Sequence, residues 1–218
     1  MSRLGRAKLA IDALRSGRPG DFALLKADLL GARASEEAAA KLCDVISYRP
    51  KIDLTELAKL PSDTFGKHYA TWMTSKKLRP FVISENLSEI ADRNTFAVRY
   101  AVTHDMLHVL TGFDTSYAGE IGVLSFAVAQ NYSPKLEASL KLASVLYPIL
   151  SLGRFNAIAN AKRRGTRFGK EADCLIGLRL EDHFGENLDA LRASLGLCLN
   201  QNDTSPKKFG ARRIRPSK

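Results

Sequence analysis

Cysteine is scarce in this sequence, with three residues among 218. Cys43, Cys174 and Cys198 lie far apart and form no CxxC pair. This spacing argues against a disulfide framework and against a zinc site built from thiolates. A reducing compartment is therefore expected.

Long apolar runs are also missing. No stretch approaches the roughly 20 consecutive apolar residues that a membrane-spanning helix needs. The N-terminus lacks the continuous apolar core of a secretory signal. The sequence therefore predicts a protein that is soluble or peripherally attached to a membrane.

Acidic residues are outnumbered, since 33 Lys and Arg against 23 Asp and Glu give a formal net charge of +10. The basic residues gather in the first 18 residues, in residues 162–170 and in the tail from residue 207. Such clusters favour anionic partners, and an anionic membrane surface is the expected one. No nucleic-acid-reading motif accompanies the charge, so nucleic acid is not expected as a partner.

The N-terminal segment, residues 1–20, is basic and predicts an amphipathic helix. Its apolar residues share one helical face: Leu4, Ala7, Ile11 and Leu14. A helix lying on a surface is the preferred interpretation. A transit peptide is the alternative, although Asp12 argues against it.

Alternating apolar and polar residues, which are typical of strands, are absent, and apolar spacing is helical instead. One stripe shows this clearly: Leu136, Leu140, Ala143, Tyr147 and Leu150. Ser133 and Pro134 precede it as a helix start signal. The sequence predicts an all-α, single-domain helical bundle over residues 1–201, with a basic, flexible tail over residues 202–218. Residues 162–170, with two Gly and five basic residues, are expected to form an exposed loop.

Two histidines mark a candidate metal site. Residues 99–112 read as one helix ended by Gly112, in which His104 and His108 lie four apart and face the same point. This is the spacing of the HExxH zinc motif, but Asp105 replaces its Glu. Because Asp is shorter, it is better suited to bind the metal or support a ligand than to act as a general base. A zinc hydrolase is therefore disfavoured.

A second helix beginning near Tyr117 is expected to return Glu120 to the first helix. Nitrogen and carboxylate ligands suit zinc, iron or manganese; zinc is the expected divalent metal, and iron is the alternative. Asp114 is a substitute ligand that spacing leaves open. The opposing interpretation is a chance histidine pair, with Asp105 paired to Arg99 and Glu120 solvated.

The ordered motifs resemble those of the ubiquinone-biosynthesis family called coenzyme Q protein 4. The family's HDxxH motif, followed by eleven residues and Glu, matches residues 104–120. Three further elements resemble the family's RPxI, LP/TFGxxYA and LRxxLG segments: residues 49–52, 60–70 and 191–196. The resemblance covers roughly residues 49–197.

The resemblance implies an all-helical fold with four metal ligands: His104, Asp105, His108 and Glu120. It implies metal-dependent, oxidative removal of the ring carboxylate from a polyprenyl-hydroxybenzoate, with a hydroxyl taking its place. The alternative is a non-catalytic, prenyl-lipid-binding scaffold that organises the other ubiquinone-biosynthesis enzymes. Arg99 is expected to form a salt bridge with Asp105 or to hold the substrate carboxylate.

The resemblance also implies a prenylated aromatic quinone precursor as ligand and a place on the quinone-bearing membrane. That is the cytoplasmic face of a bacterial inner membrane, or the matrix side of the mitochondrial inner membrane if the N-terminus is a transit peptide. The oligomeric state stays open, a homodimer included. Four residues are candidates to line a groove for the prenyl chain: Phe126, Val128, Leu146 and Tyr147.

One segment departs from the family pattern. Residues 123–127 are apolar and small, where the family often has Lys, Trp and Glu. Contacts to partner enzymes are therefore expected to differ from those of other members.

Overall fold

Helix start and stop signals divide the chain into short helices, which the computed structural model describes for residues 2–197 and for residue 199. Within those residues there are eleven α-helices, three 3₁₀ helices and no strand. The α-helices are α1 (Arg3–Arg15), α2 (Pro19–Leu29), α3 (Glu36–Lys41), α4 (Leu54–Leu57), α5 (Phe65–Ser75), α6 (Ser88–Arg93), α7 (Thr95–Thr111), α8 (Tyr117–Ala129), α9 (Pro134–Leu150), α10 (Phe155–Glu171) and α11 (Leu188–Ser194). The 3₁₀ helices are η1 (Cys43–Val45), η2 (Glu85–Leu87) and η3 (Leu180–His183). The predicted all-α, single-domain fold is confirmed, whereas Cys198 and the predicted tail 202–218 lie outside the described residues.

The caps explain the boundaries of the helices around the candidate site. The side chain of Asn94 accepts a hydrogen bond from the third residue of α7, and Gly112 ends that helix in the left-handed conformation with φ +70°. Ser116 caps α8 in the same way, by accepting from Gly119 N. Ser133 caps α9, whose first residue is Pro134. The predicted end of α7 at Gly112 and the predicted starts of α8 and α9 are confirmed, whereas α7 begins at Thr95, four residues before the predicted start at Arg99.

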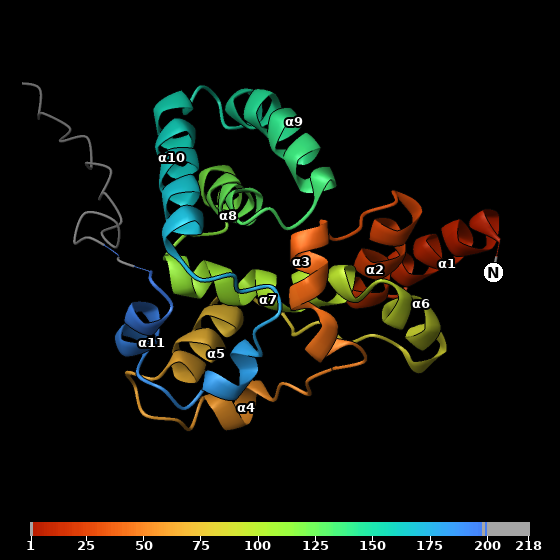
Figure 1. The fold of residues 1–218 in the computed structure, drawn as a ribbon, viewed down its shortest axis with the longest axis horizontal. Helices are drawn as coiled ribbons and strands as arrows, with labels where there is room; N and C mark the ends of the chain where they lie inside the picture. The colour runs from red at the N-terminus through yellow and green to blue at the C-terminus, as the bar shows by residue number, and fades with distance from the viewer. Residues whose placement is uncertain (1, 198, 200–218) are drawn as a thin grey trace, which may run out of the picture.

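Helix α7 runs through the middle of the molecule (Figure 1), and most of its residues are buried. It packs against α5 on one side and against α2, α6 and α8 elsewhere. A helix that is apolar around most of its circumference must be covered on several faces. Side chains of α7 are therefore held firmly in place, as a ligand-bearing helix requires.

Glycines allow α8 and α10 to pack backbone to backbone. Cβ atoms built on Gly165 and Gly169 would stand 2.0 and 2.5 Å from the carbonyl oxygens of Gly122 and Phe126. The prediction of a loop over residues 162–170 was wrong, because these residues belong to α10. Gly165 and Gly169, four residues apart, allow two helices to come into close contact here and do not form a turn.

Helix α1 packs against α2, with Ala10 and Ala13 buried in the contact. Arg6 on α1 donates to the buried carboxylate of Asp28 on α2 at 2.8 Å. The apolar residues Leu4 and Ile11 of the predicted face are more than half exposed. The N-terminal helix thus turns an apolar face to the surface. No helix in the described part of the chain has both the length and the apolarity to cross a bilayer.

Candidate metal centre

Three of the four predicted ligands meet at one point between α7 and α8. One potential ligand atom from each of His104, His108 and Glu120 lies within 4.8 Å of the others. The two Nε2 atoms of the histidines are 3.3 Å apart. The Glu120 carboxylate spans both rings, with Oε2 at 3.3 Å from His104 Nε2 and Oε1 at 3.4 Å from His108 Nε2.

These separations match those between ligands of a small divalent cation. With metal–ligand distances of about 2.0–2.1 Å and tetrahedral angles, neighbouring ligand atoms are separated by about 3.3–3.4 Å. Two neutral imidazoles cannot satisfy each other when both lone pairs point at the same place. A cation or a proton is needed between them, so the donor set fits a divalent metal.

His108 is the most firmly held ligand. Its Nδ1 lies 3.2 Å from the carbonyl oxygen of Phe113, so Nδ1–H donates and Nε2 is left with its lone pair toward the cluster. The indole of Trp72 from α5 stacks on its ring, with centroids 5.3 Å apart and planes at 22°. Tautomer and ring orientation are therefore both fixed before any ligand binds.

Glu120 carries the negative charge of the cluster. Burial acts to raise the pKa of its carboxyl group, but hydrogen bonds and charge from His104 and His108 outweigh burial and lower the pKa from 4.5 to about 2. The group is therefore ionised at any pH at which the protein is expected to work. An ionised carboxylate beside two imidazole nitrogens is a typical ligand set for zinc or ferrous iron.

Asp105 lies beside the cluster but outside the group of converging atoms. It is buried, and burial raises the pKa of its carboxyl group above 3.8, although the charges of His104 and His108 act in the opposite direction. Among the described residues, no hydrogen bond to this carboxylate is found. Burial raises the pKa of the Tyr69 hydroxyl on α5, and the negative charge of Asp105 adds to this shift. Its role as a ligand stays a prediction.

Two alternatives from the sequence have definite outcomes. Asp114 accepts hydrogen bonds from the backbone and hydroxyl of Ser116, so it shapes the turn before α8 and stands outside the cluster. The predicted pairing of Arg99 with Asp105 was wrong. Arg99 is fully buried and forms an ion pair with Glu181, whose Oε1 lies 2.8 Å from Arg99 Nη1.

An apolar groove leads to the cluster. Its cavity volume is about 520 Å³, and α2, α7 and α9 supply most of its walls. The residues that define it include Phe22, Leu30, Ala97, Tyr100, His104, Leu136 and Leu142. A groove of this size and character suits an apolar or aromatic ligand. His104 belongs to both the groove and the cluster, so a ligand in the groove reaches the candidate metal position.

The groove's walls were not predicted. Phe126, one of the four residues expected to line it, is fully buried in the core. In the described structure none of those four lines this cavity. The sequence gives little indication of this groove, because two of its walls, residues 22–32 and 135–142, are more than a hundred residues apart in the chain.

Taken together, the fold and the site define an all-helical protein with a His–His–Glu cluster that shares His104 with the wall of an apolar groove. Residues 44–200 match the model of the family described as Coenzyme Q (ubiquinone) biosynthesis protein Coq4. The chain belongs to this family.

Individual relatives agree with that assignment. The chain is 28% identical over 167 residues to the mitochondrial ubiquinone biosynthesis protein COQ4 homolog of Danio rerio, covering 70% of this chain and 58% of the relative. The Homo sapiens homolog is 27% identical over 168 residues, with 70% and 59% covered. The chain thus spans somewhat over half the length of the curated relatives that it matches.

A solved structure has a similar fold. It is a putative ubiquinone biosynthesis protein from Nostoc punctiforme, with a TM-score of 0.61 and 23% identity. The match covers 89% of this chain and 95% of the other. At this identity the likeness concerns the fold alone.

Proposed function

We propose that this protein is a metal-dependent decarboxylase of ubiquinone biosynthesis. The proposed reaction releases the ring carboxylate of a polyprenyl-hydroxybenzoate as CO₂ and places a hydroxyl group on the same carbon. Replacing carboxylate by hydroxyl is a two-electron oxidation of the ring. The external oxidant proposed for this step is molecular oxygen, which takes up the two electrons and becomes hydrogen peroxide, while water balances the added hydroxyl group. The pathway follows from the family; the reaction is what the resemblance implies, and the ligand set and the apolar groove support it.

One observation carries the proposal: His104 lies both in the metal-binding cluster and in the wall of the apolar groove. A prenylated benzoate has an apolar chain and a polar, anionic ring. The groove offers apolar walls to the chain, and the cluster would present a cation to the ring. The groove and the cluster therefore match the apolar chain and the anionic ring of the ligand, respectively.

Each residue then has a definite task. His104, His108 and Glu120 would hold the cation, with zinc as the expected metal and iron as the alternative. Asp105 would add a fourth ligand, the second carboxylate, or neutralise charge. When bound, the cation would act as a Lewis acid toward the ring carboxylate or a ring oxygen. The aromatic ring of Tyr100, which meets His104 edge to face at 5.7 Å, borders the place for the substrate ring.

The proposal is tested by His108→Ala. The variant should lose most of the roughly one metal per chain expected for the purified protein, and it should fail to restore quinone synthesis in cells that lack the protein. His68→Ala is the matched control, because His68 is exposed on α5 away from the cluster. Metal retention and full activity in His108→Ala would refute the proposed site.

The scaffold alternative makes a different prediction. If the protein only organises neighbouring enzymes around a prenyl lipid, loss of the metal ligands should leave quinone synthesis intact, whereas loss of the whole protein should abolish it. Lipid extracted from the purified chain, identified by mass spectrometry, would support either role. Only the enzyme hypothesis predicts that the metal-loaded protein converts a synthetic prenyl-hydroxybenzoate when molecular oxygen is present.

The proposed function places the protein at a quinone-bearing membrane beside other ubiquinone-biosynthesis enzymes. The curated relatives named above are described as mitochondrial. We propose the matrix side of the mitochondrial inner membrane for a eukaryotic source and the cytoplasmic face of the inner membrane for a bacterial one.

A further inference from the structure

Helix α9 carries an apolar stripe that nothing in the described structure covers. Its inner face is buried, with Leu140 and Ala143 in the core. Its outer face and the turn that follows expose large apolar side chains, from 41% for Leu146 to 95% for Leu152. The residues of this α9 stripe are Leu142, Val145, Leu146, Ile149, Leu150, Leu152 and Phe155. Single exposed apolar residues are ordinary, but a contiguous group marks a surface that meets a partner.

The turn between α9 and α10 presents this stripe outward. Leu152 has φ +53°, in the left-handed region that a leucine seldom adopts. Its neighbour Gly153 also has a positive φ. The turn thus holds its most exposed apolar side chain in solvent, in a backbone conformation that costs free energy. Burial of this side chain in an apolar environment would offset that cost. Figure 1 shows α9 and the start of α10 at one end of the molecule, beyond α8.

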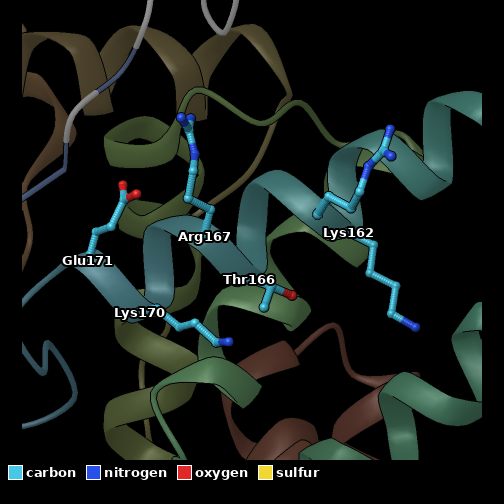
Figure 2. Close-up of a pocket in the computed structure, with 6 residues that line it drawn as sticks. Lys162, Thr166, Arg167, Lys170 and Glu171 are labelled. Carbon is cyan, nitrogen blue, oxygen red and sulfur yellow. The ribbon is translucent and has the colours of Figure 1, made fainter.

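The charge of the chain segment that contains and follows the stripe favours an anionic partner. Between Leu142 and Lys170 the sequence has six basic residues and no Asp or Glu. On α10 the basic side chains surround an open pocket of about 470 Å³ (Figure 2), lined by Lys162, Arg163, Thr166, Arg167, Lys170 and Glu171. A second copy of the chain would bring the same positive charge to this face. An anionic bilayer instead offers hydrocarbon to the stripe and negative headgroups to α10.

We propose that the α9 stripe inserts into the interfacial layer of an anionic membrane, with the basic face of α10 on the headgroups. Leu142 belongs both to the stripe and to the groove that reaches His104. The groove therefore opens beside the inserted surface, and a prenyl chain can pass from the bilayer into it without crossing water. This last step rests on the proposed function; the docking itself does not.

The test is co-sedimentation of the full chain with vesicles of phosphatidylcholine containing about a third phosphatidylglycerol. Ile149→Glu and Leu152→Glu each place a charge in the inserted surface and should weaken vesicle binding about ten-fold or more. Both side chains are exposed, so the melting temperature should stay unchanged. Ile46→Glu is the matched control, because Ile46 is an exposed isoleucine outside the stripe, and it should bind as the wild type does.

The charge contribution is tested separately. Arg163→Glu combined with Lys170→Glu reverses two exposed charges on α10. The wild type should bind vesicles with phosphatidylglycerol far better than vesicles of phosphatidylcholine alone, and this preference should shrink in the double variant. Added salt should have the same effect on the wild type.

Several outcomes would overturn the proposal. They are absence of vesicle binding by the wild type, or equal binding by Leu152→Glu and the wild type. A dimer that Ile149→Glu splits, without vesicle binding, would make the stripe a subunit interface instead. Metal content and turnover of detergent-solubilised substrate by Leu152→Glu, together with vesicle binding by His108→Ala, separate failure of docking from failure of the proposed chemistry. We expect Leu152→Glu to match the wild type in metal content and turnover. We expect His108→Ala to match the wild type in vesicle binding but to lose metal and turnover.

Discussion

Gly165 of α10 rests against the backbone of Gly122 in α8, so closely that a Cβ atom on residue 165 would stand 2.0 Å from the Gly122 carbonyl oxygen. The obstacle is backbone, which cannot rotate aside as a side chain can. Glu120 lies two residues before Gly122 on the same helix. The contact between these two glycines therefore fixes the position of one candidate metal ligand.

Gly165→Ala should destabilise the protein by about 1–3 kcal/mol, toward the upper end because the backbones must separate. Alanine's better helix propensity offsets part of this cost. Urea denaturation measures the difference. Gly185→Ala is the control, since a Cβ atom there meets nothing within 4 Å, and it should be neutral or slightly stabilising. Equal stability of the two variants would show that α8 and α10 pack differently.

Glu120→Gln should weaken metal binding by about ten-fold or more, because the amide keeps the shape but loses the charge of the ligand. It should also change how the stability of the metal-free protein depends on pH. The folded-state pKa of Glu120 is lowered from 4.5 to about 2, so its stabilising contribution is present above pH 4.5 and is lost as the pH falls toward 2. The difference in free energy of unfolding between wild type and variant should therefore narrow over that range.

The measurement is urea denaturation of the metal-free proteins at several pH values, paired with metal titration near neutral pH. Glu137→Gln is the matched control, because Glu137 pairs with Lys141 on the exposed face of α9. It should change neither metal binding nor the pH dependence. A constant gap between wild type and Glu120→Gln down to about pH 2 would contradict the assigned contacts with the histidines.

Asp105→Asn should have the opposite effect on the metal-free protein. Burial raises the pKa of Asp105 above 3.8, so the folded state resists its ionisation and loses stability as the pH rises through that pKa. The variant should therefore be more stable than the wild type near neutral pH, and the gain should vanish as the pH falls to about 3.8 and below. Metal binding should weaken in the same variant if the carboxylate serves the cation.

Thermal unfolding with and without metal measures both effects. Asp44→Asn is the control, because Asp44 is exposed on η1, and it should leave the melting temperature and metal affinity unchanged. A metal-free Asp105→Asn protein that is less stable than the wild type at neutral pH would mean that the ionised carboxylate is held by the fold itself.

The hairpin of α7 and α8 could be predicted from the sequence because its signals are local. Helical spacing, the stop at Gly112 and the start near Tyr117 determine both helices, and His104 and His108 share a face by periodicity alone. Glu120 then follows from the short connection. The cluster is built from residues at most 16 positions apart.

Features that depend on distant segments could not be predicted. The groove needs α2 and α9 to meet over α7, and no local pattern records which helices become neighbours. The two glycines of residues 162–170 suggest a turn when only the sequence is known. Their actual role is contact with α8, and the sequence does not show that α8 lies beside them. Arg99 was assigned a partner six residues away, whereas its carboxylate comes from Glu181, 82 residues along the chain.

The pair of Arg99 and Glu181 yields a further prediction. Both side chains are buried, and Arg99 also donates to the carbonyl oxygen of Leu178. Glu181→Gln leaves a buried guanidinium without its counter-charge and should cost about 3–5 kcal/mol in free energy of unfolding. Glu186→Gln is the control, because Glu186 pairs with His183 at an exposed site, and it should cost less than about 1 kcal/mol. Similar costs for both would imply that water reaches Arg99.

Ala101→Phe tests the groove without touching the cluster. Ala101 lies one turn before His104 on α7 and lines the cavity of about 520 Å³. A phenyl ring there occupies part of the space proposed for the substrate, so affinity for a prenylated hydroxybenzoate should fall about ten-fold or more. Metal content should stay at the wild-type value, because no ligand is altered.

Ala40→Phe on the exposed side of α3 is the control. Unimpaired substrate binding by Ala101→Phe would mean that the prenyl chain lies elsewhere, whereas loss of metal would mean that the groove wall and the cluster are not independent.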